Sequence, residues 1–424
     1  MRYLDTIRRI PVFCAKQLRV PLYCFFTWLI TEDIGALAYT ALPEPLSANN
    51  CKLDVKNWQD NALKRSTSKN LGLPLAIHPQ ENSPTKAKIT LGRKLFFDRR
   101  LSINKTMSCA MCHIPEQAFT NWELRTAVGV EGRTVKRNAP SLLNVGFYDV
   151  LFHDGRDTML ETQFVGPLTA RNEMANPSVG MVIKLLRDLT EYQALFMEAF
   201  ASKATLDNVG RSLASYQRSL IASNSPFDQW YYNGAENSLT QSEKNGFDIF
   251  TNKAGCVSCH NIEPSSAFFS DNEFHDIGYG WMREKLRQAP PTKTKVSVTS
   301  SITFEIDQKI IDTVGLPSEA DLGRYEVTEK PEDRWKYRTS SLRNVAVTPP
   351  YMHDGGLSSL REVIEFYNQG GGGHALQDSR VHPLNLSEQE KIDLENFLKS
   401  LTSNELSCLI AEARSNEPDN QGRR

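Results

Sequence analysis

Apolar positions recur at helical spacing along most of the chain. An apolar face runs through residues 89–97, and Val209, Leu213, Tyr216 and Leu220 follow one another at steps of three or four. Such steps place side chains on one side of a helix. No run shows the sustained alternation of apolar and polar residues that is typical of a half-buried strand. The pattern therefore predicts an all-α fold with long loops.

Three predicted helices in the second half of the chain have clear start signals. Thr240, Ser359 and Ser387 are each followed three positions later by Glu. A hydroxyl just before a helix accepts a hydrogen bond from the backbone N–H three residues on, and the Glu can bond back to the cap. We expect helices to begin directly after these residues, and the one after Ser359 carries Tyr367 on its apolar face.

Two short blocks of sequence recur at a constant separation of 200 residues. Ser-Leu-x-Asn-Val begins at Ser141 and again at Ser341, and His-Asp-Gly begins at His153 and again at His353. Self-similarity at one fixed offset is the signature of a repeated structural unit. We therefore predict two domains related by internal duplication.

Each predicted repeat also holds one Cys-x-x-Cys-His motif, at residues 109–113 and 256–260. Two thiols three residues apart on a helical turn can add to the two vinyl groups of one haem, and the adjacent His can then bind the iron. A zinc site or a redox Cys-x-x-Cys would use the cysteines but gives no reason for a His to follow twice. The motifs therefore predict two covalently bound haems c, held by Cys109, Cys112, His113, Cys256, Cys259 and His260.

The second axial position on each iron decides between electron transfer and reaction with a small molecule. At the 200-residue separation, Tyr367 corresponds to Pro167. A tyrosine phenolate can bind ferric iron, whereas proline offers no donor atom. We expect Tyr367 to close the second haem and the first haem to be open beside Pro167, although a core Tyr with a satisfied hydroxyl is the alternative. Other candidate ligands of the second haem are Met352, His353 and His275.

An open haem that reacts with peroxide needs an acid–base group, because a proton must move from one peroxide oxygen to the other. Glu173 lies six residues after Pro167, and Gln163 lies four residues before it. On a helix or turn both side chains can reach the same pocket. Glu173 is therefore the candidate proton shuttle, and a solvated surface carboxylate is the alternative.

The charge balance excludes one class of partner. The chain has 49 basic and 50 acidic residues and a net charge of -1, so it lacks the surplus of Lys and Arg that nucleic-acid binding needs. Cys51 and Cys408 lie outside the haem motifs and the leader. They form either a disulfide, which requires an oxidising compartment, or two free thiols.

The first 40 residues resemble a targeting segment. Basic residues precede an apolar run over 20–30, and Ala36-Leu37-Ala38 resembles a signal-peptide cleavage site. We expect export to the periplasm, and a short uncleaved membrane anchor is the alternative. The predicted organisation is a signal peptide or anchor over 1–40, an extended lead-in over 41–85, an N-terminal haem domain over 86–232, a C-terminal haem domain over 233–403 and a tail over 404–424.

Taken together, these motifs resemble the bacterial dihaem cytochrome c peroxidase and MauG superfamily. The resemblance implies two cytochrome-c-like helical domains, with the peroxidatic haem in the first and the electron-transfer haem in the second. It gives Glu173 the role of catalytic acid–base residue and Gln163 that of a hydrogen-bonding residue in the same pocket. It also implies a calcium ion between the domains, held by Asn138, Thr348 and Pro350. The segments that carry the resemblance are 95–98, 137–141, 154–156, 173–174, 225–228 and 342–345.

Two features resemble the MauG-type branch. Peroxidases of the superfamily usually close the electron-transfer haem with Met, where this chain has Tyr367. Many also hold the peroxidatic haem with a His from the loop after the first haem motif, but that position falls near Val130, and no His occurs between His113 and His153. The resemblance therefore implies a haem pair that stores two oxidising equivalents for use on a protein substrate.

The chain also differs from MauG. His153 replaces the Trp usually found between the haems, and Ala254 replaces a surface Trp two residues before the second haem motif. We interpret His153 as a hydrogen-bonding core residue, because titration near neutrality alone proves no role. The change at Ala254 indicates a different substrate or docking face. Trp281 is a candidate residue for relaying electrons to such a substrate, and a purely structural role is the alternative.

Three hypotheses follow. The first is a periplasmic MauG-like oxidoreductase that reacts with hydrogen peroxide at the first haem and draws electrons through the second from a protein or other donor near the C-terminal domain. The second is a cytochrome c peroxidase that detoxifies hydrogen peroxide with a small cytochrome c as donor. The third is a non-enzymatic electron-transfer cytochrome with both irons six-coordinate.

Overall fold

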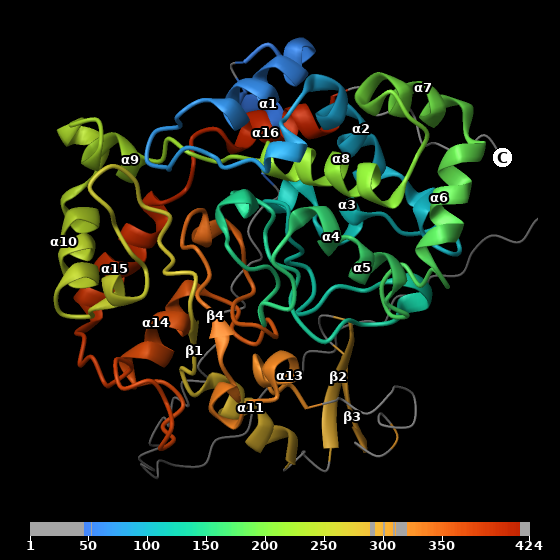
Figure 1. Cartoon of the computed structure of the whole chain (residues 1–424). Helices are drawn as coiled ribbons and strands as arrows, with labels where there is room; N and C mark the ends of the chain where they lie inside the picture. The colour runs from blue at the N-terminus through green and yellow to red at the C-terminus, as the bar shows by residue number, and fades with distance from the viewer. Residues whose placement is uncertain are drawn as a thin grey trace, which may run out of the picture. The chain divides into compact units, whose positions relative to one another are not determined.

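Helices make up most of the regular structure (Figure 1), so the prediction of a mainly helical fold is confirmed. The computed structural model describes residues 46–51, 53–288, 293–299, 302–307, 310 and 320–415, and the predicted signal peptide or anchor over 1–40 lies outside them. No helix in these ranges is long and apolar enough to cross a membrane.

The core of the first half is built where α2 (Lys86–Phe97) crosses α8 (Leu206–Arg218). Gly92 lies at the crossing, where an added Cβ would be 1.9 Å from the carbonyl oxygen of Ser212. Only glycine allows the two backbones to approach this closely. The other helices of this half are α3 (Cys109–Cys112), α4 (Leu160–Gln163), α5 (Val165–Thr169), α6 (Val179–Asp188), α7 (Thr190–Phe200) and α9 (Pro226–Tyr231).

The core of the second half repeats this arrangement with α10 (Gln241–Thr251) and α15 (Glu388–Ser400). A Cβ on Gly246 would lie 2.0 Å from the carbonyl oxygen of Asp393. Both helices begin with the predicted capping boxes at Thr240 and Ser387. Further α-helices within the described residues of this half are α11 (Tyr279–Gln288), α13 (Tyr325–Thr328) and α14 (Leu360–Asn368).

The two repeated blocks share their local backbone geometry. Asn144 and Asn344 are both left-handed, with φ of 61° and 62°. Helices α4 and α14 begin at Leu160 and Leu360, again 200 residues apart. Matching bridges link Leu151 to Asp157 and Tyr351 to Leu357.

The prediction of an extended lead-in over 41–85 is wrong in part. Helix α1 (Trp58–Thr67) forms within it and buries Trp58, Ala62 and Ser66, which are spaced four residues apart. Trp58 and Ala62 join the core of the first half. The Pro- and Asn-rich sequence on either side concealed this short helical pattern.

The segment 404–424, predicted only as a tail, contains a helix that completes the first-half core. Leu406 and Leu409 of α16 (Leu406–Arg414) are buried in that core. Cys408 on the same helix forms a disulfide with Cys51. Of the two alternatives for these cysteines, the structure therefore has the disulfide, which joins the two ends of the described chain.

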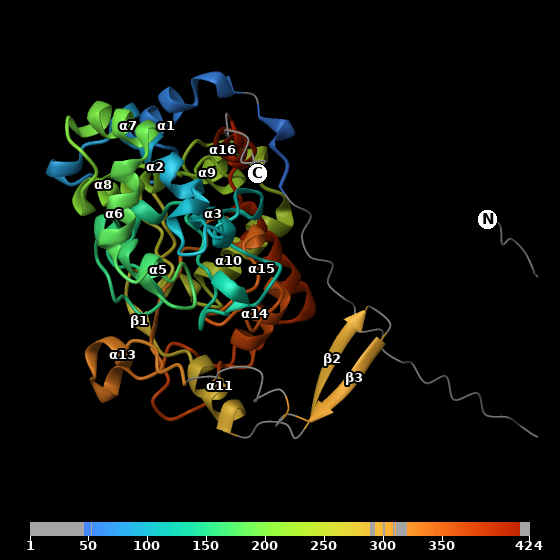
Figure 2. The same ribbon diagram turned by 90° about the vertical axis from the view of Figure 1, so that its right-hand side faces the viewer.

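Two small antiparallel sheets complete the fold, one of β1 (Phe274–His275) with β4 (Tyr337–Arg338), the other of β2 (Lys293–Thr299) with β3 (Ile302–Asp307). Figure 2 shows β2 and β3 side by side. These strands were not predicted. In β3, Ile302, Phe304 and Ile306 alternate with polar residues, but the alternation ends after six residues and is not sustained.

Candidate functional site

Each Cys-x-x-Cys-His motif lies in the wall of its own cavity. The first motif lines a cavity of about 440 Å³, together with apolar side chains of α2, α5 and α8. The second motif lines a cavity of about 340 Å³, together with side chains of α14 and α15. The structure therefore provides one mainly apolar chamber for each predicted haem.

The two motif histidines are held in the same way. Nδ1 of His113 lies 3.1 Å from the carbonyl oxygen of Phe119, and Nδ1 of His260 lies 2.8 Å from that of Phe269. Burial lowers the pKa of His113 to about 4 and also lowers that of His260. A neutral ring that donates from Nδ1 keeps the lone pair of Nε2 for a metal ion. Both imidazoles thus suit an axial iron ligand.

The thiols of both motifs are free to form thioether bonds. Cys109 and Cys112 share the first cavity and Cys256 and Cys259 share the second, and none of the four is in a disulfide. Burial raises the pKa of Cys109, Cys112 and Cys256 to about 12, so these groups are neutral thiols. Two thiols and one oriented imidazole in an apolar cavity are the donor set that a covalent haem requires.

The structure brings Gln163, Pro167 and Glu173 into the first cavity with the first motif. Gln163 ends α4, and Pro167 lies within α5. The chain then turns back, because the backbone N–H of Met174 donates to the carbonyl oxygen of Pro167 at 3.1 Å. This turn places Glu173 on the same cavity as Pro167, although six residues separate them in sequence.

Glu173 differs from a solvated carboxyl because it is partly buried in the wall of the first cavity. Burial raises its pKa, and the positive charge of Arg156 opposes this effect. Arg156 also lines the cavity, where its guanidinium lies 3.4 Å from the centre of the Phe152 ring and 3.1 Å from Asp154. At neutral pH, the protonated and ionised forms of this carboxyl therefore differ less in free energy than those of a solvated Glu.

Tyr367 lies on α14 and lines the second cavity with the second motif. Burial raises the pKa of its hydroxyl, and the two motif thiols add to the effect. Among the described residues, the hydroxyl has no hydrogen-bond partner, whereas that of Tyr351 in the same cavity donates to the carbonyl of Val345 at 2.9 Å. The phenol oxygen of Tyr367 is thus available to a ligand.

The rival ligands of the second haem all line the same cavity but differ in their contacts. The ring nitrogens of His275 lie 2.8 Å from Asp271 and 3.0 Å from Asp378, so both are engaged. The ring of His353 stacks on Tyr337 with 3.8 Å between the centroids. Met352 has a left-handed backbone with φ of 71°. Of these side chains, His275 is the least suited to bind iron.

His153 lies in the wall that the two cavities share. It lines both of them, and its Nε2 lies 3.1 Å from the carbonyl oxygen of Asn138. Burial and the charges of Arg137 and Arg338 lower its pKa to about 3, so the ring is neutral near pH 7. The side chain is a neutral hydrogen-bonding residue between the two predicted haem sites.

The two halves exchange backbone hydrogen bonds at this wall. The N–H of Asn138 donates to the carbonyl of His353 at 2.7 Å, and the N–H of Arg338 donates to the carbonyl of His153 at 2.8 Å. The donors are 200 residues apart, as are the acceptors. The repeated blocks therefore meet in a reciprocal arrangement.

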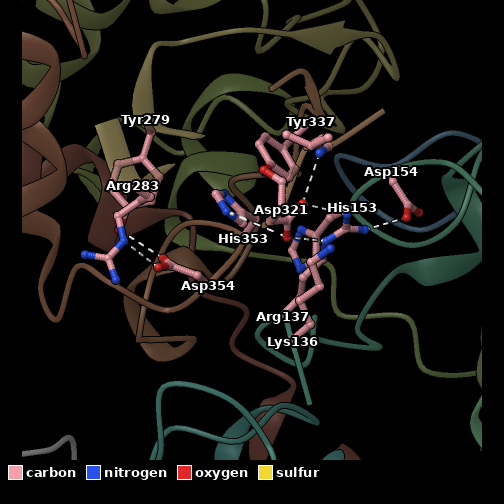
Figure 3. Close-up of polar contacts among 12 residues, drawn as sticks. Lys136, Arg137, His153, Asp154, Tyr279, Arg283, Asp321, Tyr337, His353 and Asp354 are labelled. Carbon is pink, nitrogen blue, oxygen red and sulfur yellow. Dashed lines mark hydrogen bonds and ion pairs between the residues drawn. The ribbon is translucent and has the colours of Figure 1, made fainter. Parts of the chain in front are cut away.

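A cluster of charges surrounds this contact (Figure 3). Arg137 contacts Asp154 in the first half and lies 2.7 Å from Asp321 in the second. Burial opposes ionisation of Asp321, but the hydrogen bonds and charge of Arg137 hold its pKa well below the usual value. In Figure 3, His153 and His353 lie on either side of this ion pair, and His353 is stacked on Tyr337.

The three predicted calcium ligands, Asn138, Thr348 and Pro350, all line the second cavity. The side-chain amide of Asn138 donates to the carbonyl of Arg125 at 3.0 Å, which leaves its side-chain oxygen for another partner. The Thr348 hydroxyl donates to the carbonyl of Val345 at 3.2 Å. The oxygen atoms of these residues are of the kind that calcium prefers.

Other residues near the candidate site were missed in the sequence. Asp321 lies outside the blocks that recur at 200 residues, and Arg338 lies three residues before the second Ser-Leu-x-Asn-Val block. A signal existed for Arg338, because it lies 200 residues after Asn138. Trp281, the candidate relay residue, stacks on His374 with 5.2 Å between the ring centroids and does not line either cavity.

Comparison with known proteins identifies similar chains. The family model for di-haem cytochrome c peroxidase matches residues 86–237. The chain is 35% identical to the cytochrome-c peroxidase IdrP1 of Pseudomonas sp. (strain SCT), over 78% of this chain and 85% of the relative. It is 32% identical to the methylamine utilization protein MauG of Methylorubrum extorquens, over 90% of this chain and 95% of the relative.

Solved structures with a similar fold include a MauG-like protein associated with microbial copper homeostasis. It has a TM-score of 0.64 and 28% identity, and the match covers 80% of this chain and 97% of that one. The diheme peroxidase BthA of Burkholderia thailandensis E264 has the same fold, with a TM-score of 0.62 at 23% identity over 79% of this chain and 92% of that one.

Proposed function

Because the chain belongs to the dihaem cytochrome c peroxidase and MauG superfamily, it is a peroxidase-type oxidoreductase with haem c cofactors, and we propose that it acts in the MauG manner. Hydrogen peroxide reacts at the first haem site, and electrons are drawn through the second, which Tyr367 closes. One observation carries the proposal: Pro167 lines the first cavity, and Tyr367, at the corresponding position 200 residues later, lines the second.

Each haem, when bound, supplies an iron centre that exchanges electrons with peroxide or with the other haem. Cys109 and Cys112 would hold the first haem, and Cys256 and Cys259 the second, through thioether bonds. His113 and His260 would bind the two irons through Nε2. The carbonyl groups that accept from Nδ1 fix the tautomer and the plane of each ring.

Glu173 manages the proton in the first cavity. As a carboxylate it takes a proton from one peroxide oxygen and delivers it to the other, so that water can leave. The pKa raised by burial supports this role, because the group must both accept and release a proton. Gln163 assists by hydrogen bonding in the same cavity, and Pro167 leaves space for peroxide because its ring has no donor atom.

Tyr367 closes the second site and so directs peroxide to the first. Its hydroxyl faces the cavity of the second motif and makes no hydrogen bond to any residue in the described ranges, which supports ligation by the phenol oxygen. A hard anionic ligand stabilises the oxidised iron, which suits a site that must give up electrons. The electron donor or protein substrate would dock near the C-terminal domain.

We also propose that residues 86–232 and 233–403 form two haem domains that arose by internal duplication. The equivalent helix crossings at Gly92 and Gly246 support it. So does the reciprocal hydrogen bonding of Asn138 and Arg338. Each half then provides one haem chamber around one crossed helix pair.

A calcium ion between the domains and a periplasmic location complete the proposal. The position of Asn138, Thr348 and Pro350 along one cavity supports the ion site. The Cys51–Cys408 disulfide supports an oxidising compartment.

Rapid mixing of the fully oxidised protein with one equivalent of hydrogen peroxide tests the function. We expect the absorption bands of both haems to change together, because the second haem supplies an electron to the reaction at the first. A protein whose spectrum stays unchanged at excess peroxide would contradict the proposal.

A second function, detoxification of hydrogen peroxide with a small cytochrome c as donor, is favoured by the similarity to the cytochrome-c peroxidase IdrP1. Steady-state turnover with reduced cytochrome c separates the two functions. Slow turnover is expected of a MauG-like enzyme, whereas fast turnover that saturates with cytochrome c would favour the detoxifying peroxidase.

A further inference from the structure

Arg338 is a buried cation that lacks a carboxylate partner in the described part of the chain. It is only 7% exposed. Its Nε donates to the carbonyl of Phe152 at 3.1 Å, and its guanidinium lies 3.5 Å from the centre of the Tyr148 ring. These contacts satisfy part of the hydrogen-bonding capacity but leave the positive charge without an opposite charge.

Two other buried arginines, Arg218 and Arg343, are neutralised by carboxylates. Arg218 is paired with Glu161, and Arg343 lies 2.8 Å from Asp228. A buried charge without a counter-ion is costly, since the attraction of an opposite charge must offset the loss of hydration. Arg338 therefore calls for an anion other than the carboxylates of the described residues.

The position of Arg338 indicates which anion this is. Arg338 lines the cavities of both haem motifs, and so do Tyr148 and His153. Its backbone is fixed by the pairing of β4 with β1 and by the hydrogen bond to the His153 carbonyl. Every haem carries two propionate carboxylates, and a guanidinium is well suited to bind carboxylates.

We propose that Arg338 is the shared counter-ion of the propionate groups of the two haems and couples the charge of one haem site to that of the other. This inference rests on the proposed occupancy of both cavities by haem. A fixed positive charge stabilises the reduced iron, which carries less positive charge than the oxidised iron. Arg338 then raises the reduction potentials of both haems.

The test is a redox titration of the two-haem protein and its Arg338→Gln variant, followed by visible absorption. We expect the midpoint potentials of both haems to shift downward in the variant. The matched control is Arg324→Gln. Arg324 lies over the Phe274 ring at 4.5 Å and donates to two backbone carbonyls, but it lines neither cavity, so its replacement should leave both midpoints in place.

Unchanged midpoint potentials in Arg338→Gln would overturn the inference, and a shift confined to one haem would contradict a shared counter-ion.

Arg338→Lys keeps the positive charge and should have midpoint potentials close to those of the unaltered protein. If Arg338→Gln fails to bind two haems, the midpoint potentials of the unaltered protein are measured at increasing concentrations of acetate, a free carboxylate. We expect these potentials to stay constant, because the propionates already occupy Arg338. A shift that depends on acetate would mean that Arg338 binds a free anion instead. A negative result in a variant that still reacts with peroxide leaves the proposed function intact.

Discussion

At the scale of single residues, Glu173 is the group whose protonation controls the proposed reaction. Its carboxyl must be ionised to accept the proton of peroxide, and burial raises its pKa above the ordinary value of 4.5. The reaction with peroxide should therefore slow as the pH falls through this raised pKa, at a higher pH than for a solvated Glu. Arg156, on the same cavity, limits the shift.

Glu173→Gln should slow the reaction with peroxide by about 10²- to 10⁴-fold, the range typical of lost acid–base catalysis, and should abolish the decline at acid pH. Stopped-flow mixing across a range of pH measures both effects. Glu198→Gln, at an exposed position on α7, is the control and should leave the rate unchanged. A Glu173→Gln variant with the original rate and pH profile would show that another group moves the proton.

Tyr367→Phe should change the low-spin EPR signal of the second haem, because the variant lacks the phenol oxygen. Tyr351→Phe is the matched control: its hydroxyl lines the same cavity but donates to a backbone carbonyl. The control spectrum should match that of the unaltered protein. A low-spin signal that survives in Tyr367→Phe would assign the ligand to another side chain, with Met352 and His353 the remaining candidates.

Spacing along the chain was enough to predict that Gln163, Pro167 and Glu173 share one pocket. Gln163, Pro167 and Glu173 lie within one short stretch, so local turns can bring them together. The contact of Arg137 with Asp321 was not predictable in this way, because 184 residues separate the two. Nothing in the local pattern of either residue indicates the other.

At the scale of elements, the close approach of paired helices depends on glycine. Gly246→Ala would force α10 away from α15, because the new Cβ would lie 2.0 Å from the Asp393 carbonyl oxygen. We expect a loss of about 1–3 kcal/mol in the free energy of unfolding, as for other overpacked cores. Denaturant unfolding of the two-haem protein measures this loss.

Gly180→Ala is the control for this change. Gly180 lies in α6, and a Cβ there would have nothing closer than the Ser178 hydroxyl at 3.7 Å. Because alanine forms helices more readily than glycine, this change should leave the free energy of unfolding unchanged or raise it by up to about 1 kcal/mol. Equal losses in the two variants would show that the crossing does not depend on the absence of a side chain at Gly246.

Helices with a capping signal and a sustained apolar face were predictable from the sequence, as α10 and α15 show. Helix α1 was missed because its buried positions are few and its apolar face is short. The strands β1 and β4 were missed for a different reason. Each has only two residues and exists through its pairing with a segment about 60 residues away in the chain, so neither has a pattern of its own.

At the scale of the whole molecule, the two halves are held together by ion pairs around Arg137. Arg137→Gln would leave Asp154 and Asp321 buried without their shared partner, with side chains only 4% and 14% exposed. Breaking a buried ion pair typically costs about 3–5 kcal/mol. Thermal or denaturant unfolding should show a loss of this order. Lys184→Gln, which removes an exposed pair with Asp188, should have little effect, and similar losses in both variants would contradict this role of Arg137.

The repeat at 200 residues predicts two halves of similar structure, but it does not predict how the halves contact each other. The reciprocal bonds of Asn138 and Arg338 use backbone groups, which carry no sequence signal. The two cavities differ in sequence at Pro167 and Tyr367, which occupy corresponding positions. Asp321, in the charged cluster, lies outside the repeated blocks. The contact around His153 that separates the two cavities was visible only in the structure.

Low-temperature EPR of the resting, fully oxidised protein shows whether one iron is open and the other is closed by Tyr367. We expect one high-spin signal from the first haem and one low-spin signal from the second, in equal amounts. Two low-spin signals, with no high-spin iron, would mean that a protein side chain closes both irons, and the proposed open site would be wrong.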